Sequence, residues 1–306
     1  MGVWIDTDMG FDDILAVLIV DHSELQIDGV SLVFGNAPLE RIKHNAARAS
    51  KAFGWSFPIH TGRETPVLGR LETAQHILGE SGIPTIGQSL PDAPALTHSD
   101  AFNALCKWLE DTKEPRRILA LGPLTNIAAL ALARPDLAAK IGDLTWMGGG
   151  ATSGNHTASA EFNAYADPEA LAIVLAAGIP FRMIDLDICR TVLASPSDVA
   201  PIRAERGANA TVLADLFEGF INIAVSRGRS AMALYDPVAA VAFVAPDAVT
   251  YRKVRIDAEL AGTLTRGRTV VDARASTEFN AELASAIDVE RARSMAIAAL
   301  LKEARR

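Results

Sequence analysis

The chain has 306 residues, of which 49% are hydrophobic and 22% are charged, and its formal net charge is −8. This composition excludes a disordered tail and allows a large buried core, so we expect a single domain over residues 1–306. The acidic balance, without any Lys/Arg run interleaved with aromatic residues, argues against a nucleic-acid partner.

The cysteine content and the hydropathy pattern indicate the compartment. Cys106 and Cys189 are too few for a disulfide framework and have no C-x-x-C spacing, which is typical of a reducing environment. The sequence has neither a signal-peptide pattern nor an apolar stretch of membrane-spanning length. We therefore expect a cytoplasmic protein without a membrane partner.

Strands and helices alternate along the chain. The predicted strands are Val3–Ile5, Ile27–Val33, Phe57–His60, Ile118–Leu121, Leu144–Met147 and Phe181–Asp185, with strand-like segments at Thr250–Glu259 and Thr269–Asp272. The predicted helices are Ile14–Val20, Leu39–Phe53, Ser99–Thr112, Leu124–Ala133, Asp167–Ala177, Ser197–Arg206, Ala210–Ser226, Pro237–Val244 and Asp288–Glu303. A long segment rich in Gly and Pro, Thr61–Pro94, interrupts the pattern.

This alternation predicts βαβ units and an α/β fold, with a mostly parallel central sheet flanked by helices. In open sheets of this type, ligands bind outside the carboxyl ends of the strands. The residues after the apolar runs should therefore converge on one pocket: Asp6, Asp8, Asp12 and Asp13; Asn36; Leu124 and Thr125; Met147 with Gly148–Gly150; Asp185 and Asp187.

Four aspartates lie within eight residues at the turn from the first predicted strand to the first helix: Asp6, Asp8, Asp12 and Asp13. Carboxylates this close repel one another at low effective dielectric unless they face water or share a cation. A hard divalent ion is the expected remedy, because Ca²⁺ and Mg²⁺ prefer oxygen ligands. The alternative is that the acids cap the helix N-terminus, for which one or two would suffice.

A polar segment, Ser153–Asn163, follows the triple glycine Gly148–Gly150. Its amides and its one carboxylate suit the hydroxyl groups of a sugar, because an amide can both donate and accept hydrogen bonds. An ordinary polar loop is the alternative. Phosphate binding by the glycines is disfavoured, because no Lys or Ser/Thr follows at the spacing of a P-loop.

A lone acid, Asp236, stands far along the chain in Tyr235-Asp236-Pro237. It is either a helix cap, for which Asp before Pro is common, or a distant fifth carboxylate that closes a cation site. The histidines do not have zinc-binding spacing. No G-x-S-x-G motif is present, which argues against the serine nucleophile of an α/β-hydrolase.

The segment Asp6–Asp13 closely resembles the D-x-D-P-G-x-D-D signature of the inosine-uridine type nucleoside hydrolases, calcium-dependent enzymes that cleave the N-glycosidic bond of ribonucleosides. The resemblance extends from residue 3 to about residue 245, with matching segments in the same order. These are Gly35-Asn36, Gly79–Gly82, Gly122–Asn126, Met147–Gly150, Gly154-Asn155, Ala160–Asn163, Asp167–Glu169 and Asp236-Pro237.

The resemblance implies site roles for individual residues. It implies a calcium ion held by Asp8, by both oxygens of Asp13, by the carbonyl of Thr125 and by Asp236. It implies that Asp8 is also the general base for the attacking water. It implies further that the sugar is bound through its 2′ and 3′ hydroxyls by Asp12, Asn36 and Asn163, through its 5′ hydroxyl by Asn155 and Glu161, and along its pocket by Met147.

Two positions depart from the family pattern. Tyr235 replaces a histidine that assists the departing base in many members, and Leu78, expected to contact the substrate, replaces the second histidine of H-x-H-G. A phenol is a poor acid at neutral pH, so Tyr235 is expected to stack on or hydrogen-bond the base. An aromatic residue occurs here in a purine-selective branch. Met9 replaces the signature's proline, which affects the rigidity of the turn more than the chemistry.

We expect a cytoplasmic nucleoside N-ribohydrolase that releases ribose and a free base, favours purine nucleosides, and forms a homodimer or homotetramer as family members commonly do. Two alternatives stay open. One is a magnesium-dependent phosphatase of the haloacid dehalogenase type, although Gly10 stands where that motif needs Thr or Val. The other is a nucleoside-binding protein without turnover, which would fit the missing histidines.

Overall fold

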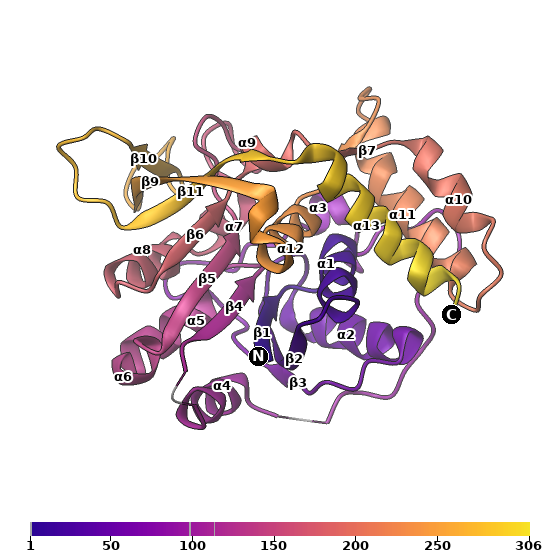
Figure 1. Cartoon of the computed structure of the whole chain (residues 1–306), viewed down its shortest axis with the longest axis horizontal. Coiled ribbons are helices and arrows are strands. Elements are labelled where there is room, and N and C mark those ends of the chain that lie inside the picture. Colours follow the sequence, from indigo (N-terminus) through magenta and orange to yellow (C-terminus); the bar gives the residue numbers. More distant parts are fainter. Residues whose placement is uncertain (1, 98, 113) are drawn as a thin grey trace.

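The computed structural model describes residues 2–97, 99–112 and 114–306, and its ribbon is shown in Figure 1. A nine-stranded sheet runs through these residues. Its strands are β1 Gly2–Thr7, β2 Gln26–Leu32, β3 Ile59–Thr61, β4 Arg116–Ala120, β5 Ile141–Met147, β6 Phe181–Ile184, β9 Val249–Ala258, β10 Thr269–Asp272 and β11 Ala281–Ile287. A separate antiparallel pair is formed by β7 Leu193–Ala194 and β8 Met232–Ala233.

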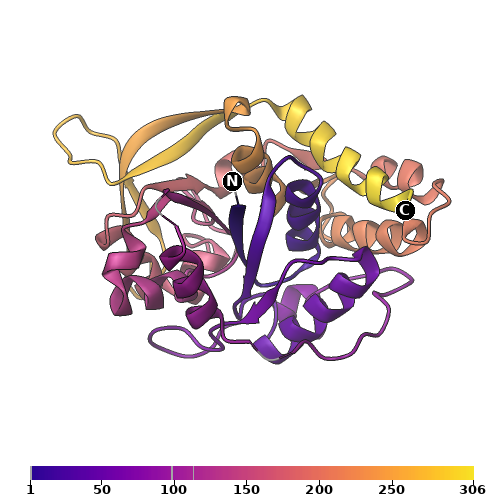
Figure 2. The ribbon, with the colours of Figure 1, turned by 60° about the horizontal axis from the view of Figure 1, so that its bottom comes forward.

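The strand order is β10-β9-β11-β6-β5-β4-β1-β2-β3. Neighbours from β3 to β11 pair in parallel, whereas β9 runs antiparallel to both β11 and β10. The segments that join β9, β10 and β11 extend from that end of the sheet (Figures 1 and 2). The sheet is therefore mostly parallel, as the alternation of strands and helices predicts.

Helices cover both faces of the sheet. They are α1 Phe11–Asp21, α2 Leu39–Phe53, α3 Gln75–Leu78, α4 Ala101–Glu110, α5 Thr125–Ala133, α6 Pro135–Ala138, α7 Phe162–Ala166, α8 Pro168–Ala176, α9 Leu186–Cys189, α10 Val199–Arg203, α11 Ala210–Val225, α12 Asp236–Val244 and α13 Val289–Ala304, with 3₁₀ turns η1 Pro196–Asp198 and η2 Pro246–Ala248. No helix in the described ranges is long and apolar enough to cross a bilayer.

The alternation of side chains along β1 explains the two layers. Val3 and Ile5 pack into a core shared with α1, α12 and α13, whereas Trp4 packs into a second core with α4, α5 and α8. Successive residues of a strand point to opposite faces, so a strand buried on both faces needs an almost continuous apolar run. This is why Val3–Ile5 has no polar residue.

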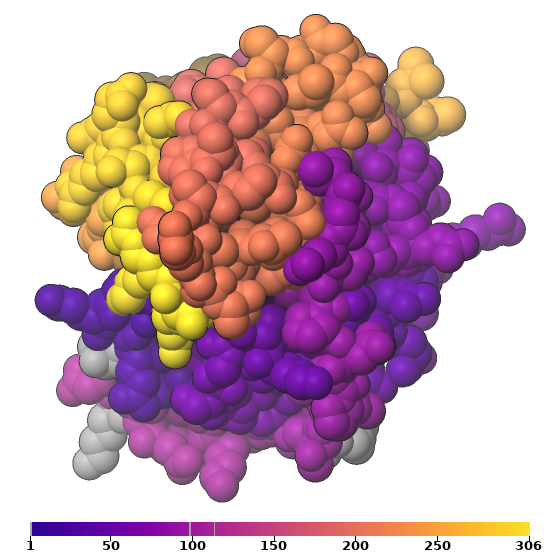
Figure 3. Space-filling model, turned by 90° about the vertical axis from the view of Figure 1, so that its right-hand side faces the viewer, coloured from indigo at the N-terminus to yellow at the C-terminus, as the bar shows by residue number. Residues whose placement is uncertain are grey.

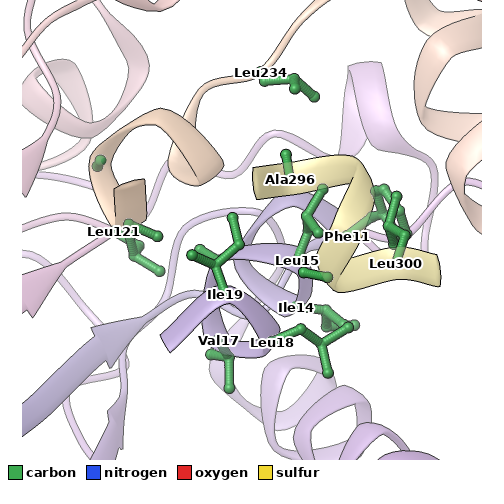
Figure 4. Close-up of a cluster of buried hydrophobic side chains, with 14 of the residues drawn as sticks. Phe11, Ile14, Leu15, Val17, Leu18, Ile19, Leu121, Leu234, Ala296 and Leu300 are labelled. Atoms are coloured by element: carbon green, nitrogen blue, oxygen red, sulfur yellow. The ribbon is translucent and has the colours of Figure 1, made fainter. Parts of the chain in front are cut away.

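The largest core lies around α1, which packs against α12 and α13. Figure 4 shows Phe11 and Leu15 of α1 close to Ala296 and Leu300 of α13. All four side chains are buried. Because α12 begins at Asp236, this apolar packing also brings the start of α12 next to the start of α1.

The predicted loop Thr61–Pro94 is mostly irregular, but it contains the short helix α3 and packs along α11. The backbone N–H of Gln88 donates to Asp215 Oδ2 at 2.7 Å, and a Cβ on Gly219 would meet the backbone of Pro84 and Thr85. Figure 3 shows purple atoms of this part of the chain bordering the orange and salmon atoms that precede the C-terminal segment. The loop thus joins the wall built by α11.

The sequence missed one strand of the sheet and several short helices. β11 has the sequence AELASAI, in which small alanines carry little strand signal, and it is held by pairing with β6 on one side and β9 on the other. Strand formation of this kind depends on the neighbouring strands more than on local propensity. The helices α3, α6, α7 and α9 have only four or five residues each, too few for a helical period.

Leu18→Ala tests the packing around α1. Leu18 is 0% exposed in the core, so its truncation should lower the free energy of unfolding by about 2–5 kcal/mol through lost burial and a residual cavity. Urea denaturation measures this change. The control Leu132→Ala truncates a leucine of α5 that is 65% exposed and should change the free energy by less than about 0.5 kcal/mol. Equal effects would contradict this account of the core.

Candidate active site

A cavity of about 320 Å³ lies at the carboxyl ends of β1, β2, β4 and β5. Ten of the residues that the sequence singled out line it: Asp8, Asp12, Asn36, Leu78, Met147, Asn155, Glu161, Asn163, Tyr235 and Asp236. They come from segments as far apart as the first turn and the start of α12. The convergence expected from a parallel sheet is therefore found, apart from the positions discussed below.

Three carboxylates meet at the floor of the cavity, where Asp12 and Asp236 line it and Asp13 lies behind them. Asp12, Asp13 and Asp236 each present one oxygen within 4.8 Å of the others. Asp13 is fully buried and Asp236 is 4% exposed. The packing of α1 against α12 brings the distant acid to the N-terminal cluster, and local sequence could not decide this contact.

Asp8 is held beside this group by Asn36. The backbone N–H of Asn36 donates to Asp8 Oδ2 at 2.7 Å, and its side-chain Nδ2 donates to Asp8 Oδ1 at 3.1 Å and to Asp13 Oδ2 at 3.0 Å. Gly35 permits this approach, because a Cβ there would overlap the Asp8 carboxylate. One asparagine thus fixes two of the acids.

Asp13 is also bound by its own turn. Thr7 Oγ1 donates to Asp13 Oδ1 at 2.5 Å, and the backbone N–H of Gly10 donates to Asp13 Oδ2 at 2.8 Å. The second bond satisfies an N–H at the start of α1, so the capping interpretation holds for Asp13. It does not account for Asp8, Asp12 and Asp236. Met9, between the acids, has φ +44°, a left-handed conformation that proline cannot adopt.

The acids have no positive partner in the described ranges, where no Lys, Arg or His forms an ion pair with any of them. Burial, and then mutual repulsion, raises the pKa of Asp8 and Asp236 well above the usual value and that of Asp12 to about 7. Such a buried cluster of hard oxygen donors, without thiolate or imidazole, fits a divalent cation such as Ca²⁺ or Mg²⁺.

Glu161 and Asn163 form a second polar wall. Glu161 caps α7 by accepting from the backbone N–H groups of Asn163 at 2.8 Å and Ala164 at 3.0 Å, and it also accepts from Gly149 at 2.7 Å. Burial raises its pKa to about 7. Asn163 Nδ2 donates to the carbonyls of Leu121 and Met147, at 2.8 and 3.0 Å. Its amide nitrogen is therefore committed to the protein.

Asn155 reaches the cavity from the polar segment. It is exposed, and its Oδ1 accepts from the backbone N–H of Phe162 at 3.0 Å, which ties its loop to the start of α7. Met147, at the end of β5, is 3% exposed and lines the cavity. The polar segment is therefore part of the site rather than an ordinary surface loop.

Tyr235 immediately precedes the acidic start of α12 and is largely buried. Burial is the main reason that its pKa is raised above the usual value of a tyrosine. Leu78, at the end of α3, is half-buried and lines the same cavity. Neither residue is a proton donor of the kind that a histidine provides near neutral pH.

Several of the positions expected in the pocket do not line it: Asp6, Asp13, Leu124, Thr125, Gly148–Gly150, Asp185 and Asp187. Thr125 is buried, and its Oγ1 donates to Asp167 Oδ2 at 2.6 Å. The expectation for Asp185 and Asp187 is wrong: Asp185 accepts from Ala151 N at 3.0 Å and Asp187 from Thr152 N at 3.0 Å. Both acids follow β6 and hold the loop that follows β5, which passes over the end of β6.

The sequence also missed several lining residues. Apolar Phe220 and Ile223 of α11 and the cations Arg190, Arg227 and Arg229 line the cavity. His76 and His156 do so as well, with ring centroids 5.7 Å apart. His76 is the first histidine of the H-x-H-G position and His156 lies in the polar segment, but no motif marks the arginines or the residues of α11.

The chain belongs to the inosine-uridine preferring nucleoside hydrolase family, whose model matches residues 3–294. It is a hydrolase that acts on the N-glycosidic bond of ribonucleosides. The resemblance read from the aspartate signature is thereby confirmed, and the match argues against the phosphatase alternative.

Relatives cover almost the whole chain. The non-specific ribonucleoside hydrolase RihC of Salmonella typhi is 33% identical over 296 residues, which are 95% of this chain and 94% of the relative. The pyrimidine-specific ribonucleoside hydrolase RihA of Escherichia coli O127:H6 is 31% identical with the same coverage. The structure of a purine-preferring ribonucleoside hydrolase from Gardnerella vaginalis has a TM-score of 0.92 at 25% identity, covering 100% of this chain and 99% of the other.

The buried acids predict how stability depends on pH without metal. The pKa values of Asp12 and Glu161 are about 7 in the folded protein and about 3.8 and 4.5 when unperturbed, so between these limits the folded state binds more protons than the unfolded state. The free energy of unfolding in EDTA should therefore fall as the pH rises from about 4.5 to 7.

Urea denaturation at a series of pH values measures this dependence. Glu161→Gln removes one titrating group and should flatten the slope, whereas the control Asp21→Asn changes an exposed acid at the end of α1 and should leave it unchanged. A slope that Glu161→Gln leaves unaltered would show that this buried carboxyl does not titrate as described.

Proposed function

We propose that this protein is a calcium-dependent nucleoside N-ribohydrolase that releases ribose and a free base, with purine nucleosides favoured. The observation that carries the proposal is the meeting of Asp12, Asp13 and Asp236, from opposite parts of the chain, on the floor of a cavity with Asp8 and Asn36. Capping the N-terminus of α1 would not require a carboxylate from α12.

We assign the cation to Asp8, both oxygens of Asp13, the carbonyl of Thr125 and Asp236. The burial of these acids and the lack of positive partners in the described ranges support this set. A bound Ca²⁺ would orient the sugar diol and lower the pKa of a water molecule. The choice of calcium over magnesium rests on the number of carboxylates, since calcium accepts more oxygen ligands and bidentate ones.

Asp8 is the general base in this proposal. Asn36 holds both of its carboxylate oxygens, so the side chain has one fixed orientation at the cavity. A positioned carboxylate can take the proton of the attacking water while the oxygen of that water bonds to C1′ of the sugar. Asp8 then gives this proton to solvent after the products have left.

The sugar hydroxyls are assigned to the two polar walls. Asp12, Asn36 and Asn163 are proposed to bind the 2′ and 3′ hydroxyls, and Asn155 and Glu161 the 5′ hydroxyl, with Met147 against the ring. Breaking the C1′–N bond builds positive charge on the ribosyl ring. Carboxylates and amide oxygens arranged before the reaction stabilise that charge where it develops.

Tyr235 is proposed to pack on the departing base. Its raised pKa makes the phenol a poor proton donor at neutral pH, and apolar Phe220 and Ile223 line the same cavity. A flat aromatic surface with apolar neighbours accommodates a purine.

We further propose that residues 1–306 form one domain in a cytoplasmic homodimer or homotetramer. One cavity takes its lining from Asp8 through Asp236, which supports one domain. The two free cysteines are buried, which is compatible with a reducing compartment. The proposed oligomeric state is the one that family members commonly have. Sedimentation analysis of the purified chain tests it.

A nucleoside panel tests the activity. Purified protein with Ca²⁺ should release reducing sugar and free base from inosine, adenosine, guanosine, uridine and cytidine, fastest from the purine nucleosides. EDTA should abolish release, and added Ca²⁺ should restore it. Saturable nucleoside binding without product would instead support the binding-protein alternative, and restoration by Mg²⁺ alone would contradict the choice of metal.

Asp8→Asn tests the general base. The substitution keeps the size of the side chain but removes the proton acceptor, so kcat should fall by about 10²- to 10⁴-fold while nucleosides still bind. Steady-state kinetics and nucleoside titration measure both properties. The control Asp21→Asn should retain full activity, and an Asp8→Asn variant with unchanged kcat would remove Asp8 from this role.

Substitutions of Tyr235 separate stacking from proton donation. If the ring acts by packing, Tyr235→Phe should change kcat by no more than about two-fold, whereas Tyr235→Ala should lower kcat/KM by about 3- to 10-fold, the worth of an aromatic contact. A large loss of kcat in Tyr235→Phe would show instead that the hydroxyl takes part in the reaction.

A further inference from the structure

Three arginines line the cavity whose floor is formed by the aspartates. Arg190 follows α9, and Arg227 and Arg229 flank Gly228 in the connection from α11 to β8. The floor is buried and acidic, whereas Arg227 and Arg229 are exposed and therefore belong to the rim. The cavity thus changes from negative at its floor to positive at its rim. The proposed function gives these cations no role.

Arg190 is fixed in the wall. Its Nη1 donates to Ser153 Oγ and its Nη2 to the carbonyl of Gly154, both at 2.8 Å, and Asp187 lies 3.7 Å from Nη1. These contacts hold the guanidinium beside the polar segment that contributes Asn155. Among the described residues, Asp187 is the one acid in an ion pair with Arg190, and the 3.7 Å separation is long, so the charge of Arg190 is only partly balanced.

Arg227 and Arg229 are placed by a tight turn. Gly228 has φ +77°, and the backbone N–H groups of both arginines return to the carbonyl of Ala224 at 3.1 Å. In the described ranges, neither guanidinium forms a hydrogen bond or an ion pair. A position after a helix C-terminus favours a cation. That preference does not explain why both side chains adjoin the cavity.

Two of the arginines, Arg190 and Arg229, lie near Tyr235. The guanidinium groups of Arg190 and Arg229 act to lower the pKa of the Tyr235 phenol, although burial outweighs them and raises it. Ribose on the acidic floor, as proposed above, directs the base past Tyr235 toward the rim. The base and the arginines therefore share this part of the cavity.

We infer that Arg190, Arg227 and Arg229 stabilise the departing base as an anion, so that a base leaves more readily the more stable its anion is. This inference rests on the proposed function. The C1′–N bond breaks with its electron pair going to the nitrogen, the hydroxyl of water bonds to C1′, and the water proton passes to Asp8. The base anion takes a proton from solvent after release.

The charge pattern matches the reaction. Cleavage makes C1′ positive and the base negative, and a cavity with carboxylates at the floor and guanidinium groups at the rim favours that separation. Such a site needs no proton donor at position 235. It also discriminates among bases: one that forms a stable anion benefits more than an aminopurine, which leaves poorly without protonation.

The double substitution Arg227→Gln/Arg229→Gln tests the inference. Xanthine forms a more stable anion than adenine does, so wild-type kcat/KM should be higher for xanthosine than for adenosine. The double variant should lose about ten-fold in kcat/KM for xanthosine and less than about three-fold for adenosine, as expected for lost charge contacts near solvent. Arg227→Lys/Arg229→Lys should keep most of the preference.

Inhibition by free bases gives a readout independent of turnover. The inhibition constant of urate, an anion at neutral pH, should rise about ten-fold in the glutamine double variant, whereas that of adenine should not change. The matched control is Arg252→Gln, an exposed arginine of β9 away from the cavity, which should alter neither. Thermal denaturation of each variant verifies that it is folded.

The outcomes separate the two proposals. A wild-type protein that hydrolyses no nucleoside refutes the proposed function. A wild-type protein that does hydrolyse nucleosides, together with equal losses for xanthosine and adenosine or unchanged urate inhibition in the double variant, refutes only the inference. A selective loss for xanthosine in His76→Gln or His156→Gln, larger than that of the arginine variant, would replace anion stabilisation by proton donation.

Discussion

The structure depends on buried negative charge that the chain does not neutralise by itself. Asp8, Asp13 and Asp236 are almost inaccessible to solvent and share no ion pair in the described ranges. A fold dedicated only to stability would replace such a group with apolar residues, because unpaired buried carboxylates cost several kcal/mol each. Their position at one cavity ties this constraint to the proposed function, since a bound cation would offset the cost.

The scaffold meets this constraint with rigid elements rather than with long loops. Asp12, Asp13 and Asp236 stand at the first turns of α1 and α12, two helices that pack on each other in the largest core. Asn36 follows β2 and bonds to two of the carboxylates, while Gly35 leaves the space that they occupy. Apolar packing that carries no chemistry thus fixes the distances between charged groups.

The same organisation gives the cavity two kinds of wall. Residues after the parallel strands are buried and acidic, whereas the walls from α9, α11 and the long β3–α4 connection supply aromatic, apolar and cationic side chains. A sugar needs fixed hydrogen-bond partners, which suits the strand ends. In the proposed assignment the base meets residues from these connections, and the relatives do differ in their named preferences.

The sequence alone determined the α/β class, the acidic turn and the family, because a buried parallel strand and a clustered-acid motif are local patterns that need few neighbours to be read. The sequence could not predict β11, whose alanines form a strand only between β6 and β9. It also could not show that Asp185 lies outside the pocket, where this residue holds a loop. Tertiary structure decided that Asp236 reaches the floor and that Arg227 and Arg229 reach the rim. Both outcomes arise from helix packing between distant segments, and no local spacing encodes that.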